Sequence, residues 1–185
     1  MMRVLGISGS LRRNSHNGRL LRAAAALLPP GVELVQFGGL KAIPPFDEDD
    51  ERAPTAAVIE WREQLEAADA LLFATPEYNH SIPGALKNAV DWASRPFATA
   101  ALRNKPAAVI GTSTGMFGAV WAQAELRKSL AAAGARVVDR ELPVADAENA
   151  FAPDGALTEH DQTLALGEIL AELLAEARRR EPVGA

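Results

Sequence analysis

The sequence predicts an α/β protein in which five parallel strands form a doubly wound sheet, in the order 2-1-3-4-5, with helices on both faces. Apolar runs of strand length alternate with stretches of helical periodicity, which is the pattern of a parallel sheet with helical crossovers. The strand runs are apolar at almost every position, as in strands covered on both faces. Right-handed crossovers then favour this strand order. We expect the 185 residues, 1–185, to form one domain.

A strand, a polar loop and a helix open the chain. Residues 4–7 are apolar and predict the first strand, and residues 20–28 place leucine and alanine at helical spacing. Residues 8–17, between them, are rich in glycine, hydroxyl groups and basic side chains. The stretch Pro29-Pro30-Gly31 predicts a sharp turn before a second strand at 32–37.

The segment 38–54 is rich in glycine and proline and contains the acidic stretch 47–51, so we expect a long surface loop. The later elements are expected, in chain order, as a helix at 55–68, a buried strand at 69–75, a helix with Pro83 in its first turn that continues to Ala93, a strand at 107–113, a helix to Ala133 that Gly134 ends, a short strand at 136–138, an irregular segment at 141–157 and a helix at 159–180.

Composition excludes several classes of protein. The net charge is −5, and the basic residues form no long run before Arg178-Arg179-Arg180, so we expect no nucleic-acid partner. That triplet suits the C-terminus of a helix. The absence of cysteine excludes disulfides and thiolate chemistry, and the isolated His16 and His160 predict no metal site. The first strand begins close to Met1 and no apolar run reaches transmembrane length, so we expect a cytoplasmic protein without a signal peptide or membrane contact.

The loop at 8–17 is predicted to bind an anion. It opens a helix, whose first N–H groups have no partner within the helix and carry the positive end of the helix dipole. Ser10, Ser15 and Asn17 add hydrogen-bond donors, and Arg12 adds a charged one. A second interpretation stays open, in which Ser15 or Asn17 only caps the helix and Arg12 and Arg13 are solvated.

The anion is predicted to belong to a mononucleotide. The loop at 8–17 fits neither GxxxxGK[ST] nor GxGxxG, which disfavours nucleoside triphosphates and dinucleotides. Two further loops leave the carboxyl ends of strands, at 76–81 and 113–118, where ligands bind in such sheets. The first offers a tyrosine ring, an amide and an imidazole, and the second offers glycines that let a flat group approach the backbone. A phosphate beside a planar heterocycle points to FMN.

Three stretches together resemble the NADPH-dependent FMN reductase family, which has a flavodoxin-like fold and includes bacterial quinone, chromate and azo-dye reductases. They are Gly9-Ser10-Leu11-Arg12 with Ser15 and Asn17, then Pro76-Glu77-Tyr78-Asn79, then the segment 83–92. The resemblance runs from about residue 3 to residue 130. It implies that Ser10, Arg12, Ser15 and Asn17 hold the FMN phosphate, that Pro76, Glu77, Tyr78 and Asn79 line the isoalloxazine ring and ribityl chain, and that Ser113 and Gly115 close the other side.

The resemblance also implies an activity. NADPH or NADH passes a hydride to the flavin and leaves, and a small-molecule acceptor such as a quinone, an azo compound, chromate or free flavin then takes its place. No side chain is expected to act as an essential acid or base. The family implies a homodimer or homotetramer, with the helix around 86–92 at the interface. Relatives that reduce quinones and chromate carry an Arg and a Tyr early in the fourth helix, whereas the segment 119–125 has neither.

Other classes of protein share this fold. A flavodoxin-type electron carrier would bracket its flavin with aromatic rings, and only Tyr78 is placed for that. A phospho-acceptor receiver domain needs an aspartate at the end of the third strand, where this chain has Thr75-Pro76. A non-enzymatic flavin-binding protein and an arsenical reductase also remain open as alternatives.

Overall fold

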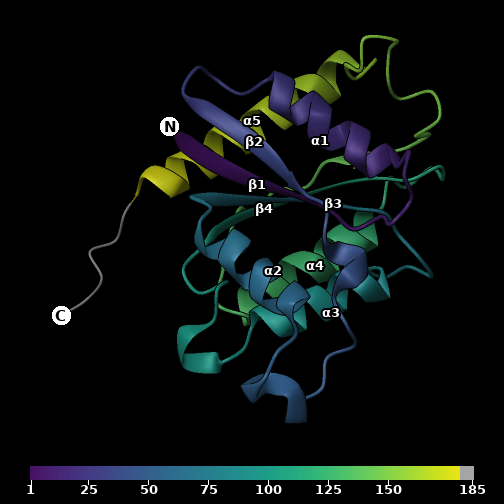
Figure 1. The fold of residues 1–185 in the computed structure, drawn as a ribbon. Helices are drawn as coiled ribbons and strands as arrows, with labels where there is room; N and C mark the ends of the chain where they lie inside the picture. The colour runs from purple at the N-terminus through teal and green to yellow at the C-terminus, as the bar shows by residue number, and fades with distance from the viewer. Residues whose placement is uncertain (180–185) are drawn as a thin grey trace.

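The chain folds into a parallel sheet with helices on both faces, as the sequence predicts (Figure 1). The computed structural model describes residues 1–179, and the strand order is β2-β1-β3-β4-β5, with β6 also paired to β4. The strands are β1 (Met2–Ser8), β2 (Val32–Phe37), β3 (Ala70–Thr75), β4 (Pro106–Thr112), β5 (Arg136–Val137) and β6 (Pro143–Val144). The helices are α1 (His16–Ala26), α2 (Ala56–Glu66), α3 (Gly84–Ala93), α4 (Val120–Ala132) and α5 (His160–Arg178), with short 3-10 turns at Leu40–Ala42, Asp49–Arg52 and Phe97–Thr99.

Two apolar cores lie on the two faces of the sheet. Every residue of β3 and β4 is buried, because successive side chains of these strands point into opposite cores. Leu71 and Phe73 pack in the core that contains apolar side chains of α2, α3 and α4. Leu72 and Ile110 pack in the core beneath α1 and α5. Figure 1 shows the same division of the helices around the strands.

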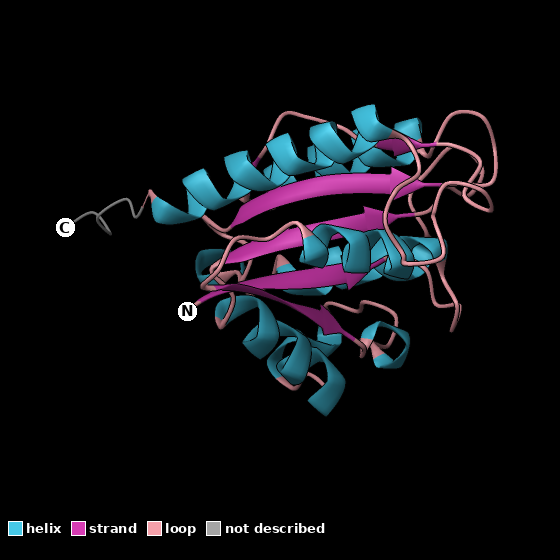
Figure 2. Cartoon of the chain, turned by 90° about the horizontal axis from the view of Figure 1, so that it is seen from above, coloured by secondary structure: helices cyan, strands magenta, loops and turns pink. Residues whose placement is uncertain are grey.

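The register brings the carboxyl ends of the central strands together. Ser8 of β1 lies beside Ala74 of β3, and Thr75 of β3 lies beside Gly111 of β4. Figure 2 shows the arrows pointing one way, with the longer loops gathered beyond their heads. The loops predicted to form the site therefore leave the same end of the sheet.

The segment 38–54 is only partly the surface loop that was expected. Leu40 and Ile43 are buried in the core beneath α2 and α3. Phe46 packs edge-on against Trp92, with 5.0 Å between ring centroids, and the indole N–H of Trp92 donates to the carbonyl of Pro44 at 2.8 Å. The apolar half of the segment thus fills space beside α3, whereas the acidic half is largely exposed.

The segment 141–157 was expected to be irregular, which is wrong at Pro143–Val144. These two residues form β6, which pairs in parallel with Gly111 and Thr112 at the carboxyl end of β4, while β5 pairs with the start of the same strand. A two-residue strand is too short to show a periodic pattern. Further on, Phe151 and Leu157 form an antiparallel bridge.

Several predicted helix ends shift by a few residues. Pro83 precedes α3 with a ψ of 138°, so it stands just outside the first turn. Gly134 follows α4 with a φ of +92°, which confirms it as the residue that ends this helix. Helix α5 ends at Arg178, and Arg180 of the predicted basic triplet lies outside the described residues. Within residues 1–179, no helix has the length and apolar character that crossing a bilayer requires.

Candidate functional site

The N-terminus of α1 offers two free backbone donors at the carboxyl end of the sheet. Ser15 has extended backbone angles and caps the helix, and its hydroxyl accepts the N–H of Gly18 at 3.3 Å. The N–H groups of His16 and Asn17, in the first turn, find no acceptor among residues 1–179. These groups also carry the positive end of the helix dipole, so they can bind a phosphate or carboxylate.

The side chain of Asn17 is used inside the protein. It is 2% exposed, its amide group donates to the carbonyl of Thr112 at 3.0 Å, and its oxygen accepts the N–H of Thr112 at 3.1 Å. This pair of bonds ties the start of α1 to the end of β4. Ser15 therefore caps α1, as the capping interpretation expects, whereas Asn17 bonds a distant strand instead of capping the helix. With both side chains engaged, the α1 terminus offers a ligand its backbone N–H groups.

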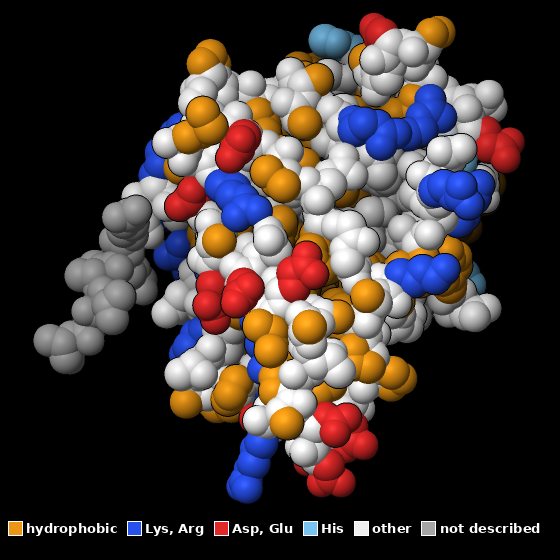
Figure 3. Space-filling model, viewed as in Figure 1, with side chains coloured by type: hydrophobic (Ala, Val, Ile, Leu, Met, Phe, Trp, Pro, Cys, Tyr) orange, Lys and Arg blue, Asp and Glu red, His pale blue; other side chains and the backbone are white. Residues whose placement is uncertain are grey.

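Ser10 and Arg12 stand in the loop before α1. The hydroxyl of Ser10 accepts the N–H of Arg12 at 3.4 Å, which leaves its proton for another acceptor. Arg12 is exposed, and its guanidinium contacts no carboxylate or carbonyl acceptor in the described part of the chain. In the space-filling view, basic side chains gather over α1 and its preceding loop, and acidic ones gather near the bottom (Figure 3). The loop is therefore suited to an anionic ligand.

A tight turn displays Tyr78. The N–H of Tyr78 donates to the carbonyl of Ser81 at 3.0 Å, and the N–H of Ser81 returns a bond at 3.1 Å. Asn79 and His80 between them have φ angles of 54° and 59°, as in a type I′ turn. The turn leaves Tyr78 51% exposed.

Arg12 and Tyr78 line one cavity of about 340 Å³, which is the strongest link between the first two predicted loops. The other lining residues are Gly9, Leu11, Pro83, Gly84 and Ala85. A Cβ atom at Gly9 would lie 2.8 Å from Leu86 Cδ2 and 3.2 Å from Pro76 Cδ, so a larger residue there would force these side chains to shift. Leu11 and residues 83–85 were not singled out as site residues, although they stand in the stretches that carry the resemblance.

Glu77 turns its carboxylate toward α4. One oxygen accepts the N–H of Trp121 at 3.0 Å and that of Ala122 at 3.1 Å, in the first turn of this helix. The N-terminus of α4 is therefore occupied by a side chain of the protein. Because α1 keeps free donors and α4 does not, α1 is the better position for an anionic ligand at this end of the sheet.

The third loop, 113–119, is hydrogen-bonded to β6 and to the residues just after it. Ser113 donates its N–H to Val144 at 3.2 Å, and Gly115 accepts the N–H of Asp146 at 3.3 Å. Gly118 has a φ of +55°, and a Cβ atom there would lie 2.5 Å from the backbone of Pro143. Ser113 and Gly115 thus stand on a fixed loop at the carboxyl end of β4. Asp146 is a carboxylate beside this loop that sequence reasoning missed, because it comes from a later segment.

An exposed aromatic cluster connects the second and third loops. The rings of His80 and Trp121 meet edge-to-face with centroids 4.6 Å apart, and Phe117 meets Trp121 at 4.9 Å. Phe117 and Trp121 are both largely exposed. The contact between His80 and Trp121 joins residues 41 positions apart, so local sequence pattern does not reveal it. Such a cluster suits contact with a flat, apolar molecule.

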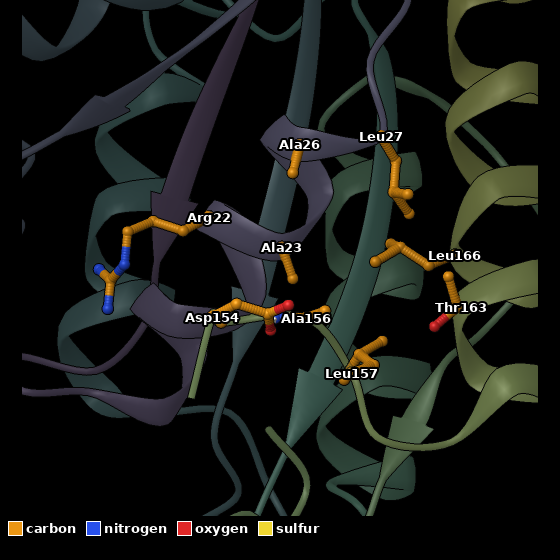
Figure 4. Close-up of a pocket in the computed structure, with 10 residues that line it drawn as sticks. Arg22, Ala23, Ala26, Leu27, Asp154, Ala156, Leu157, Thr163 and Leu166 are labelled. Carbon is orange, nitrogen blue, oxygen red and sulfur yellow. Dashed lines mark hydrogen bonds between the residues drawn. The ribbon is translucent and has the colours of Figure 1, made fainter. Parts of the chain in front are cut away.

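A separate cavity of about 300 Å³ lies between α1, α5 and the turn at 154–157 (Figure 4). Small apolar side chains, including Ala23, Ala26 and Ala156, line much of it, and the guanidinium of Arg22 points away from it. Asp154 contributes a carboxylate to its wall, which would repel a phosphate. This cavity therefore does not compete with the α1 terminus as the anion site.

The titratable groups with clear pKa shifts lie elsewhere. Burial lowers the pKa of Lys105, against the opposing effect of Asp69 and Glu66, and its ammonium group donates to the carbonyls of Glu66 and Ala68 at the end of α2. This is a structural contact. Within residues 1–179, no group of three or more His, Asp or Glu side chains is placed to hold a metal ion.

Comparison with known proteins finds relatives in both sequence and structure. Residues 2–149 match the family model described as NADPH-dependent FMN reductase. The chain is 45% identical over 158 residues to an NAD(P)H-dependent FMN reductase of Pseudomonas aeruginosa, which covers 84% of each chain. It is 42% identical over 128 residues to a 2-hydroxy-1,4-benzoquinone reductase of a Burkholderia species, covering 68% of each. The structure of the flavoenzyme NAD(P)H:(acceptor) oxidoreductase FerB from Paracoccus denitrificans superimposes with a TM-score of 0.84, at 33% identity, over 97% of this chain and 98% of FerB.

Proposed function

The chain belongs to the NADPH-dependent FMN reductase family, and we propose that it is an FMN-dependent NAD(P)H oxidoreductase whose acceptors are quinones or similar small molecules. Two observations carry the proposal: the free N-terminus of α1, and a cavity lined by Tyr78 and by Arg12 of the loop that leads into α1. Donors for a phosphate and an exposed aromatic ring for a flat ring system support the binding of a flavin mononucleotide. Azo compounds, chromate and free flavin are further candidate acceptors.

The residues present fit FMN. The phosphate would be held by the N–H groups of His16 and Asn17, the hydroxyl of Ser10 and the guanidinium of Arg12. The ring system and ribityl chain would lie against residues 76–79, with Ser113 and Gly115 on the other side. In this arrangement Ser15 acts by capping α1, which keeps the donors of its first turn in place.

Bound FMN supplies the redox chemistry, accepting a hydride from NADPH or NADH and passing the electrons on to the acceptor in a second step. The protein binds the donor and the acceptor in turn at the same open face, in a ping-pong cycle. Tyr78, Phe117 and Trp121 provide exposed aromatic surface at which flat molecules can be excluded from water. We assign no side chain as an essential acid or base.

We also propose that residues 1–185 form a single FMN-binding domain that works in the cytoplasm as a homodimer or homotetramer. Leu86 and Trp92 of the expected interface helix are buried within the chain, so the outer face of α3 presents Lys87 and Asp91 instead. Two shallow hollows of about 310 and 290 Å³ lie beside this face and include Ser129 and Ala132 of α4. We propose that a second subunit packs on this surface.

The absorbance spectrum of the purified protein, followed by oxidation of NADH and NADPH with and without a quinone, tests the function. We expect a flavin spectrum and acceptor-dependent oxidation of the nicotinamide. A flavin-loaded protein that oxidises neither nucleotide would instead be an electron carrier or a non-enzymatic flavin-binding protein.

A further inference from the structure

Helix α4 takes its N-terminal cap from a distant part of the chain. The residue before it, Ala119, has a φ of 62° and no side chain that could accept a hydrogen bond. The carboxylate of Glu77 fills this place by accepting the N–H groups of Trp121 and Ala122. An anion at this position also interacts favourably with the helix dipole.

The surroundings of Glu77 keep its carboxylate fixed. The side chain is 11% exposed, and His80 Nδ1 lies 3.6 Å from its other oxygen. His80 itself packs edge-to-face against the ring of Trp121, whose backbone N–H the carboxylate accepts. A largely buried carboxylate that accepts two backbone bonds has little freedom to move.

Glu77 therefore joins two loops through one side chain. Its backbone leads directly into the turn that displays Tyr78, and the helix that it caps is preceded directly by the loop 113–119. We infer that Glu77 is a positioning residue, which fixes the spacing between the Tyr78 turn and the loop 113–119 on the two sides of the flavin ring. The inference rests on the proposed function for the flavin, whereas the coupling of the two loops is a property of the protein alone.

Three variants separate positioning from simple stabilisation. Glu77→Ala removes both bonds, whereas Glu77→Gln keeps one oxygen that can accept them. Glu63→Ala removes an exposed carboxylate on α2 and serves as the charge-matched control. Each FMN-free protein is examined by hydrogen exchange of its backbone amides and by thermal unfolding, and is then titrated with FMN.

We expect Glu77→Ala to speed exchange in both 78–81 and 113–122 and to weaken FMN binding on the order of tenfold, with Glu77→Gln restoring binding to within about threefold. Glu63→Ala should match the wild type. Faster exchange confined to the first turn of α4, with unchanged FMN affinity, would overturn the inference and leave Glu77 as a helix cap only. If the wild type takes up no FMN, the proposed function fails, and unaltered exchange in 113–119 would separately refute the coupling.

Discussion

Asn17 offers a sharp test of how the α1 terminus is built. The sequence pattern placed its amide on the FMN phosphate, whereas the structure uses that amide to bond both backbone groups of Thr112. Asn17→Ala should therefore destabilise the FMN-free protein, because it leaves a buried N–H and a buried carbonyl without partners. Each unsatisfied group costs about 1–3 kcal/mol, so the free energy of unfolding should fall by about 2–6 kcal/mol.

Urea unfolding of the FMN-free protein measures this loss directly, and the melting temperature should fall with it, by about 2–4 °C for each kcal/mol in a chain of this size. Asn14→Ala is the matched control, since Asn14 is an exposed amide of the same loop and its loss should change stability by about 0.5 kcal/mol at most. Unchanged stability in Asn17→Ala, together with weaker FMN binding, would show that the amide belongs to the ligand and would refute the structural reasoning.

Three further outcomes are expected. Arg12→Ala should leave the circular dichroism spectrum unchanged and weaken FMN binding by roughly ten- to a hundredfold, because a charge-assisted bond to phosphate contributes about 1.5–3 kcal/mol; equal affinity in a flavin titration would make Arg12 a solvated residue. Chromatography of the released cofactor should give FMN rather than FAD, in about one equivalent per chain, since one helix terminus holds one phosphate. Stepwise reduction should bleach the flavin with little semiquinone. Negative charge beside the flavin would disfavour its two-electron reduced anion, but the carboxylate of Glu77 is directed to α4 and that of Asp146 accepts a bond from Asn149. Abundant neutral semiquinone with negligible NAD(P)H oxidation would indicate an electron carrier.

Local pattern was enough to predict the five-strand order of the sheet, but not β6. The strands β3 and β4 are apolar throughout and buried on both faces, so their place at the centre followed from composition alone. The strands β5 and β6 have two residues each, and the pairing of β6 with β4 depends on contacts between distant segments. The burial of Leu40 and Ile43 was missed for the same reason, because α3 provides the surface that they cover.

The sequence predicts which loops carry the candidate site, but not how their side chains are used. Arg12 and Tyr78 were assigned to two different loops, and the structure places both on one cavity. The orientation of Asn17 could not be read from its neighbours, since its partner Thr112 is 95 residues away. Glu77 was expected to line the flavin, and the position of its carboxylate on α4 depends on a contact across 44 residues. Residue type predicts which chemistry is available, and tertiary contacts decide which atoms remain free for a ligand.

The pairing of β4 with two short strands, β5 and β6, affects the tendency of this sheet edge to aggregate. An outer strand of a sheet exposes unpaired N–H and carbonyl groups to which another chain can add a strand. Here the edge of the sheet beside β4 consists of two short strands, β5 and β6, which are separated by the segment 138–142. Arg140 in this segment bonds Glu168 and Glu172 of α5, each at 2.8 Å. The outer border is therefore interrupted halfway along its length. A strand of another molecule could pair with only two consecutive residues of β5 or of β6. This edge is therefore a poor template for intermolecular β-structure.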